Sequence, residues 1–146
     1  MRCGAIATVA TLPVAVAMTA AAAAQATRSE YVFQSPSGNI VCDLHATDTG
    51  PGAFVYCVVR DHSWSSPLPP SYCPDGRPPE TLVLNAGSPA ALTCHPAPWA
   101  PAATLDYGQS RSVPPVDCVS QLTGITCSDT DTGHFFRASR ETCQLG

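Results

Sequence analysis

Two stretches of the chain repeat the same order of apolar and polar positions. In residues 32–56 and again in residues 118–136, an apolar, β-branched run reaches a glycine, and a second β-branched run with a cysteine, Cys42 or Cys127, follows. Each stretch then continues through Thr-Asp-Thr-Gly into an aromatic run. Such runs, separated by glycine and aspartate, are typical of strands joined by turns. We therefore predict two similar three-stranded meanders, with glycine and aspartate at the turn positions of positive φ.

The middle of the chain, residues 60–115, has a different composition. Ten of the chain's 15 prolines lie between Pro67 and Pro101. Because proline removes a backbone donor and disrupts helices, this stretch is expected to be extended or turning. Within it, residues 81–84 and 91–94 flank a turn-forming segment and predict a hairpin. A disordered linker is the alternative interpretation.

Two cysteines together with Trp64, Tyr72 and Trp99 within this middle stretch favour a folded segment over a linker. The predicted fold is therefore all-β: a small disulfide-stapled domain built from the two meanders, a central hairpin and a Pro-rich segment. At 146 residues the chain is too short for two independent cores, so a single domain is expected.

The N-terminal residues 1–26 have the features of a secretory signal. A positively charged start and an uncharged, alanine-rich apolar run lead to Ala24-Gln25-Ala26, the small-x-small pattern that signal peptidase recognises. We predict cleavage near Ala26 and a secreted, β-rich domain over residues 27–146, outside the cell or in its envelope. A retained membrane anchor is the alternative, because the apolar run is about 20 residues long. The many alanines favour the signal, since alanine drives membrane insertion weakly.

The charge of the chain excludes one class of partner. The net charge is -4, with no lysine, and removal of the signal leaves 6 arginines against 11 acidic residues, or -5. A nucleic-acid-binding protein needs a basic face to neutralise phosphates, so no nucleic acid is expected as a partner. We expect an extracellular or envelope ligand, and no stable insertion into a membrane once the signal is removed.

Of the 8 cysteines, Cys3 lies in the signal and seven remain. In an exported chain these indicate a disulfide framework, and an odd number leaves one thiol free or available to link two copies. The strand interpretation favours the pairs Cys42–Cys57, Cys73–Cys94 and Cys118–Cys127, with Cys143 as the free or intermolecular thiol. A pair between Cys127 and Cys143 stays open as the alternative. No Cys-x-x-Cys is present, so neither a metal site nor a cofactor is predicted.

The motifs together resemble an uncharacterised family of small secreted actinobacterial proteins, a domain of unknown function. They cover most of the chain after residue 26. The pieces that carry the resemblance are Ser35-Pro36-Ser37-Gly38-Asn39-Ile40-Val41-Cys42, Trp64 with the prolines leading to Cys73, Leu105-Asp106-Tyr107-Gly108, Gly124-Ile125-Thr126-Cys127 and Thr132-Gly133-His134-Phe135-Phe136. The resemblance implies export, a compact stapled fold and Cys143 as the cysteine outside the family's set of six. It implies no reaction.

Candidate binding residues come from two places. Trp64, Tyr72 and Trp99 lie among prolines, where aromatic side chains can form a platform for sugars or extended peptides. The alternative is that the tryptophans fill the core. His134 follows a glycine turn close to Arg137, which can pair with a ligand carboxylate or with a surface acid.

No catalytic residue is predicted, because the chain has no nucleophile elbow. No calcium site is predicted either, because the calcium loop is incomplete. The function expected is a non-enzymatic binding or interaction module. A small envelope hydrolase with an unrecognised site is one alternative, and a secreted inhibitor that uses its Pro-rich loop is another. Carboxylates gathered around His134 would favour the enzyme, and exposed tryptophans side by side would favour the binding module. A protruding, disulfide-flanked loop over residues 67–79 would favour the inhibitor.

Overall fold

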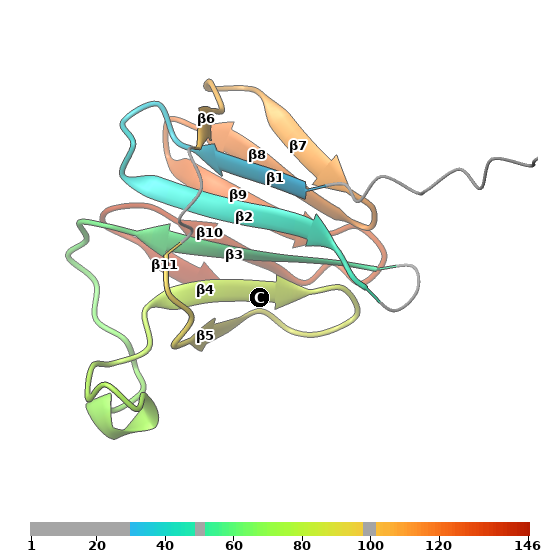
Figure 1. Ribbon diagram of the computed structural model, residues 1–146. Helices are drawn as coiled ribbons and strands as arrows, with labels where there is room; N and C mark the ends of the chain where they lie inside the picture. Colours follow the sequence, from blue (N-terminus) through green and yellow to red (C-terminus); the bar gives the residue numbers. More distant parts are fainter. Residues whose placement is uncertain (1–29, 49–51, 98–101) are drawn as a thin grey trace, which may run out of the picture.

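The computed structural model describes residues 30–48, 52–97 and 102–146 and consists of two antiparallel-rich sheets packed face to face (Figure 1). The first sheet has six strands in the order β5-β4-β3-β2-β1-β6. Its strands are β1 (Glu30–Gln34), β2 (Ile40–Ala46), β3 (Ala53–Val59), β4 (Thr81–Asn85), β5 (Ala91–Thr93) and β6 (Ala103–Thr104). The second sheet has five strands in the order β11-β10-β9-β8-β7. Its strands are β7 (Ser110–Val113), β8 (Val116–Gln121), β9 (Gly124–Asp129), β10 (Phe135–Ala138) and β11 (Cys143–Leu145).

The predicted all-β class, both meanders and the central hairpin are confirmed. The meanders are β1–β2–β3 and β8–β9–β10, and each contributes three adjacent strands to a different sheet. The hairpin is β4–β5, and the one helical segment among the described residues is the 3₁₀ turn η1 (Pro70–Tyr72) of the Pro-rich segment. Three strands were not predicted: β6, which pairs in parallel with β1, and β7 and β11 at the two edges of the second sheet.

The core lies between the two sheets and follows the alternation of each strand. In β2 and β3 the residues that face the second sheet are buried, among them Leu44 and Val55, and their counterparts in the second sheet include Ile125 and Phe136. Alternate residues point to the outer faces, because successive side chains of a strand project to opposite sides. Burial of these apolar side chains is the main favourable contribution to folding.

All three favoured disulfides are present. Cys42–Cys57 and Cys118–Cys127 each join directly paired residues on neighbouring strands and point into the core, and Cys73–Cys94 ties the loop after η1 to the end of β5. Cys143 is the one free cysteine of the described ranges. Three disulfides are typical of proteins that fold in an oxidising, extracellular environment. None of the helical segments within the described ranges is long and apolar enough to cross a membrane.

The two meanders are not exact copies. The disulfide of the first joins its second and third strands, whereas the disulfide of the second joins its first and second strands. The prediction of aspartate at positive φ was wrong for the described residues, since every residue with positive φ there is a glycine, including Gly38 and Gly133. The physical reason is steric: a Cβ atom crowds the backbone in this region, and glycine has none.

The chain between β5 and β6 connects opposite edges of the six-stranded sheet. The described part of this connection lies over the outer face of the sheet. The ring of His95 packs at a tilt against the ring of Tyr56 of β3, with centroids 4.0 Å apart, and the backbone oxygen of His95 accepts a hydrogen bond from the Thr81 hydroxyl of β4. As a result Tyr56 and Thr81 are buried although they face away from the core.

Candidate functional site

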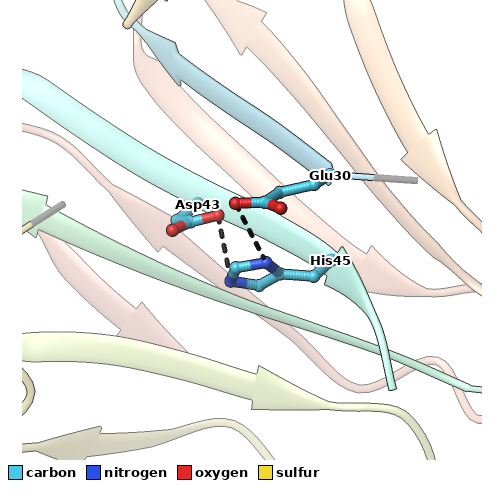
Figure 2. A group of neighbouring side chains, drawn as sticks. All are labelled: Glu30, Asp43 and His45. Carbon is cyan, nitrogen blue, oxygen red and sulfur yellow. Dashed lines mark ion pairs between the residues drawn. The ribbon is translucent and has the colours of Figure 1, made fainter. Parts of the chain in front are cut away.

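Three ionisable side chains gather on the outer face of the six-stranded sheet (Figure 2). Glu30 of β1 is paired in register with His45 of β2, and Asp43 lies two residues before His45 on the same strand. Because a strand has a side-chain period of two, Asp43 and His45 project to one face, and the antiparallel register brings Glu30 beside them. We call Glu30, Asp43 and His45 the β1–β2 cluster.

The two carboxylates approach the imidazole from different sides. Asp43 Oδ1 lies 3.0 Å from His45 Nε2, and Glu30 Oε1 lies 3.8 Å from His45 Nδ1. One candidate ligand atom from each residue lies within 4.8 Å of the other two. The side chain of Asp43 is only 9% exposed, whereas that of Glu30 is 57% exposed. The cluster is therefore anchored in the sheet at Asp43 and open to solvent at Glu30.

Aromatic residues of β3 hold the cluster in place. The Tyr56 hydroxyl donates a hydrogen bond of 2.9 Å to Asp43 Oδ2, and the ring of Phe54 lies 4.5 Å from the ring of His45. Burial raises the pKa of Asp43, and the hydrogen bond from Tyr56 and the nearby His45 oppose that shift. Burial and the acceptor Asp43 together raise the pKa of Tyr56 to about 12.

The second carboxylate oxygen of Asp43 has no donor. Oδ1 is buried and accepts no hydrogen bond, although His45 Nε2 lies at 3.0 Å, so the ring N–H direction does not meet it. A buried carboxylate oxygen without a donor is costly, because the hydration that it has lost is not replaced. The cluster thus places the imidazole of His45 and the carboxylate of Glu30 near the unsatisfied oxygen of Asp43.

The β1–β2 cluster was not among the sites predicted from the sequence. A signal was present in Asp43-Leu44-His45, since alternate polar residues within an apolar strand indicate one polar face. The contribution of Glu30 depends on the register of β1 against β2, and that register is not visible in the sequence.

Tyr72, a predicted binding residue, lies in η1 at the tip of the Pro-rich segment. This loop, residues 67–79, extends away from both sheets (Figure 1, lower left). Tyr72 is 56% exposed, and Cys73 next to it is buried in the disulfide to Cys94. The loop therefore protrudes, is rich in proline and is tied at its middle residue, Cys73, by a disulfide to Cys94.

Trp64, by contrast, is engaged within the fold. Its indole N–H donates to the backbone oxygen of Ser139 at 3.0 Å, and its ring stacks on His62 with centroids 3.8 Å apart. Trp64 is also packed against the core. Trp64 is therefore partly buried at the margin of the core and does not fill its centre. Trp99 lies outside the described residues.

The remaining predicted residues belong to the second sheet. His134 lies in the turn between β9 and β10, and Arg137 lies on β10, where its Nε donates to Thr126 Oγ1 at 3.2 Å. Within the described ranges no hydrogen bond, ion pair or ring contact joins Trp64, Tyr72, His134 and Arg137 to one another. The structure does not gather these four into one site.

Cys143 begins β11 and is packed against the core from the edge of the second sheet. Burial raises the pKa of its thiol. A thiol with a raised pKa has less of the reactive thiolate at neutral pH.

Comparison of the chain with protein-family models, with curated proteins and with solved structures finds no match, so the sites described above rest on the geometry of this chain alone.

Proposed function

We propose that the protein is a secreted, non-enzymatic interaction module that presents the loop of residues 67–79 to a partner protein outside the cell or at its envelope. The signal is removed near Ala26 in this proposal. The observation that carries it is the protruding Pro-rich loop with Tyr72 exposed at its tip and the next residue, Cys73, held in a disulfide to Cys94. A secreted inhibitor, which inserts such a loop into its target, is the specific form that this geometry favours.

The loop is held in one conformation before any partner arrives. The N–H of Tyr72 donates to the oxygen of Pro69 at 2.9 Å, and the N–H of Gly76 donates to the oxygen of Cys73 at 3.0 Å. The prolines fix φ at several positions, and Cys73–Cys94 fastens the loop to the sheet. A preorganised loop loses little conformational entropy on binding, which favours affinity.

The exposed side chains of the loop suit recognition of a protein. Tyrosine is enriched at binding hot spots because it contributes a large apolar area and a hydroxyl with only two rotatable bonds. Asp75 and Arg77 of the same loop form an exposed ion pair, with Arg77 Nη2 2.9 Å from Asp75 Oδ2. An aromatic anchor with a charged rim is the usual composition of an interface.

Three further observations support export. Three disulfides require an oxidising compartment to form and persist. The residue pattern also resembles that of the small secreted family described above, and the first 26 residues have the features of a secretory signal.

The experiment is site-specific photo-crosslinking on the producing cells. A photoreactive phenylalanine analogue replaces Tyr72 in one variant and Tyr107 in a matched control, because Tyr107 is 50% exposed but lies outside the loop. We expect a discrete adduct from position 72, absent from position 107, that unmodified protein competes away. Equal labelling at both positions, or none at position 72, would refute the loop as the binding element.

A further inference from the structure

The β1–β2 cluster carries a second inference that does not depend on the loop. Its central observation is the oxygen Oδ1 of Asp43, which is buried, accepts no hydrogen bond and points into the cluster. The other oxygen of this carboxylate is satisfied by Tyr56. A positive group at Oδ1 would remove the cost of the unsatisfied oxygen.

The contact between Asp43 and His45 has the spacing of two ligands that share one ion. Metal–nitrogen and metal–oxygen bonds of about 2.0–2.2 Å place neighbouring ligand atoms about 3.0–3.4 Å apart. Asp43 Oδ1 and His45 Nε2 are 3.0 Å apart. In a metal site the nitrogen lone pair is aimed at the ion and not at the oxygen, which agrees with the absence of a hydrogen bond between these atoms.

Glu30 can complete the set. Its carboxylate lies within 4.8 Å of the ligand atoms of Asp43 and His45, and its exposed side chain is free to rotate about its own bonds. Two carboxylates with a neutral imidazole carry a charge of -2, which balances a divalent ion. The side chain of Glu30 also lies on the solvent side, where an ion would enter.

We propose that Glu30, Asp43 and His45 bind a divalent transition-metal ion of the zinc type, with at least one coordination position open to water. An imidazole ligand selects against Ca²⁺ and Mg²⁺, which prefer oxygen ligands alone. Tyr56 and Phe54 act as positioning residues: the hydroxyl orients the Asp43 carboxylate, and the ring of Phe54 orients the imidazole. This proposal differs from the expectation of no metal that the cysteine spacing gave.

The rival explanation is that a proton on His45, and not a metal ion, balances the two carboxylates. If His45 is protonated, its positive charge lies beside both carboxylates and forms two ion pairs without any metal. The two accounts differ in one measurable respect, because only the metal site binds Zn²⁺ or Co²⁺ at one ion per chain.

The test is titration of the protein with Zn²⁺ and with Co²⁺ by calorimetry and Co²⁺ absorption. The full chain is expressed with its leader and recovered with its disulfides intact, in a Cys143→Ser background so that no free thiol contributes. The pair of His62 and Glu80 is a matched control, with His62 Nε2 3.5 Å from Glu80 Oε2. It also joins an imidazole to a carboxylate, but the carboxylate is exposed and not buried. The variants are Glu30→Gln and His45→Gln, with His62→Gln and Glu80→Gln as controls.

We expect one ion per chain, with affinity lowered at least about tenfold by Glu30→Gln and more strongly by His45→Gln, and unchanged in the two controls. Excess Ca²⁺ should not displace Co²⁺. Glu30 is exposed, so its variant is expected to fold, and near-ultraviolet circular dichroism checks this for each protein. Absence of one-to-one binding, or binding that Glu30→Gln and His45→Gln leave unaltered, would overturn the proposal.

Discussion

The carboxylate of Asp129 accepts a hydrogen bond of 2.6 Å from the backbone N–H of Gly87. Asp129 ends β9 in one sheet, and Gly87 lies in the turn of the β4–β5 hairpin in the other. The second carboxylate oxygen of Asp129 accepts hydrogen bonds from the N–H groups of Asp131 and Thr132. This single, fully buried side chain therefore organises one turn and joins it to the other sheet. The hydrogen bond from Gly87, foremost, and those from the neighbouring turn lower the pKa of Asp129.

Replacing Asp129 by asparagine should destabilise the protein, because an amide has one acceptor oxygen where the carboxylate has two. A lowered pKa in the folded state contributes stability that is present above the ordinary value of 3.8 and is lost as the pH falls through the folded pKa. We therefore expect Asp129→Asn to have a lower Tm at pH 7 and a weaker loss of stability below about pH 4. Thermal unfolding from pH 2 to pH 7 measures both. Asp131→Asn is the control, and equal effects of the two substitutions would contradict the role of Asp129.

Gly124 should be the glycine least tolerant of substitution among those at turns. Its φ is +118°, and a Cβ atom there would lie 2.1 Å from the backbone oxygen of Ala138. Gly133 also has positive φ, at +81°, but its Cβ would meet nothing within 4 Å. We expect Gly133→Ala to cost about 1 kcal/mol of unfolding free energy and Gly124→Ala clearly more, since β9 and β10 must separate. Urea unfolding compares the two, and similar losses would show that the close approach is relieved cheaply.

The parts of the fold that could be predicted are those specified by residues close together in the sequence. The strands of the two meanders are specified by local signals, the β-branched runs and the glycine turns, and the structure has them where they were predicted. Two disulfides could be predicted from these strands, because Cys42–Cys57 and Cys118–Cys127 join residues across adjacent strands. The strand β6 was not predicted, because two residues carry no periodic pattern and its partner β1 is some 70 positions away along the chain.

The candidate sites divide in the same way, into those visible in the local sequence and those that depend on contacts between distant residues. The Pro-rich loop was visible in the composition, and its protrusion makes Tyr72 accessible as the sequence suggested. Trp64 has the same sequence signal, but its indole contacts Ser139, a residue 75 positions away, so its engagement in the fold is a long-range property. The β1–β2 cluster was missed for a similar reason: Glu30 meets His45 only through the register of two strands.

Trp64 should stabilise the fold through one hydrogen bond in addition to its packing. Trp64→Phe keeps an aromatic ring over His62 but removes the donor to the oxygen of Ser139. We expect a loss of about 1 kcal/mol in unfolding free energy, the usual value for a hydrogen bond in the folded state. Tyr107→Phe, which changes an exposed aromatic residue, should stay within about 0.5 kcal/mol of the parent. Chemical unfolding gives both values, and a loss no larger than that of the control would mean that the hydrogen bond contributes nothing.

The three disulfides should differ in their resistance to reduction. Cys42–Cys57 and Cys118–Cys127 are fully buried, whereas Cys94 of the third bridge is exposed. Because a thiolate must reach a sulfur atom, mild reductant should open Cys73–Cys94 first in the native protein. Alkylation followed by peptide mass mapping identifies the opened pair. Since this bridge closes 21 residues, Cys73→Ala with Cys94→Ala should cost about 3 kcal/mol in the chain-entropy model. Simultaneous opening of all three bridges would contradict the difference in access.

Cys143 should behave as a protected thiol and not as a link between two copies. Its side chain packs against the core and burial raises its pKa, so both access and thiolate content are low in the folded state. We expect one thiol per chain to be alkylated quickly in urea and slowly in buffer at pH 8, and the intact mass without reductant to be that of a monomer. The Cys143→Ser variant should also have the intact mass of a monomer. This variant is the control for any association that does not depend on the thiol. A doubled mass that halves on reduction and disappears in Cys143→Ser would instead establish an intermolecular disulfide. That result would favour a separation of β11 from β10, because the side chain of Cys143 is partly buried against the core while Cys143 pairs with Ala138.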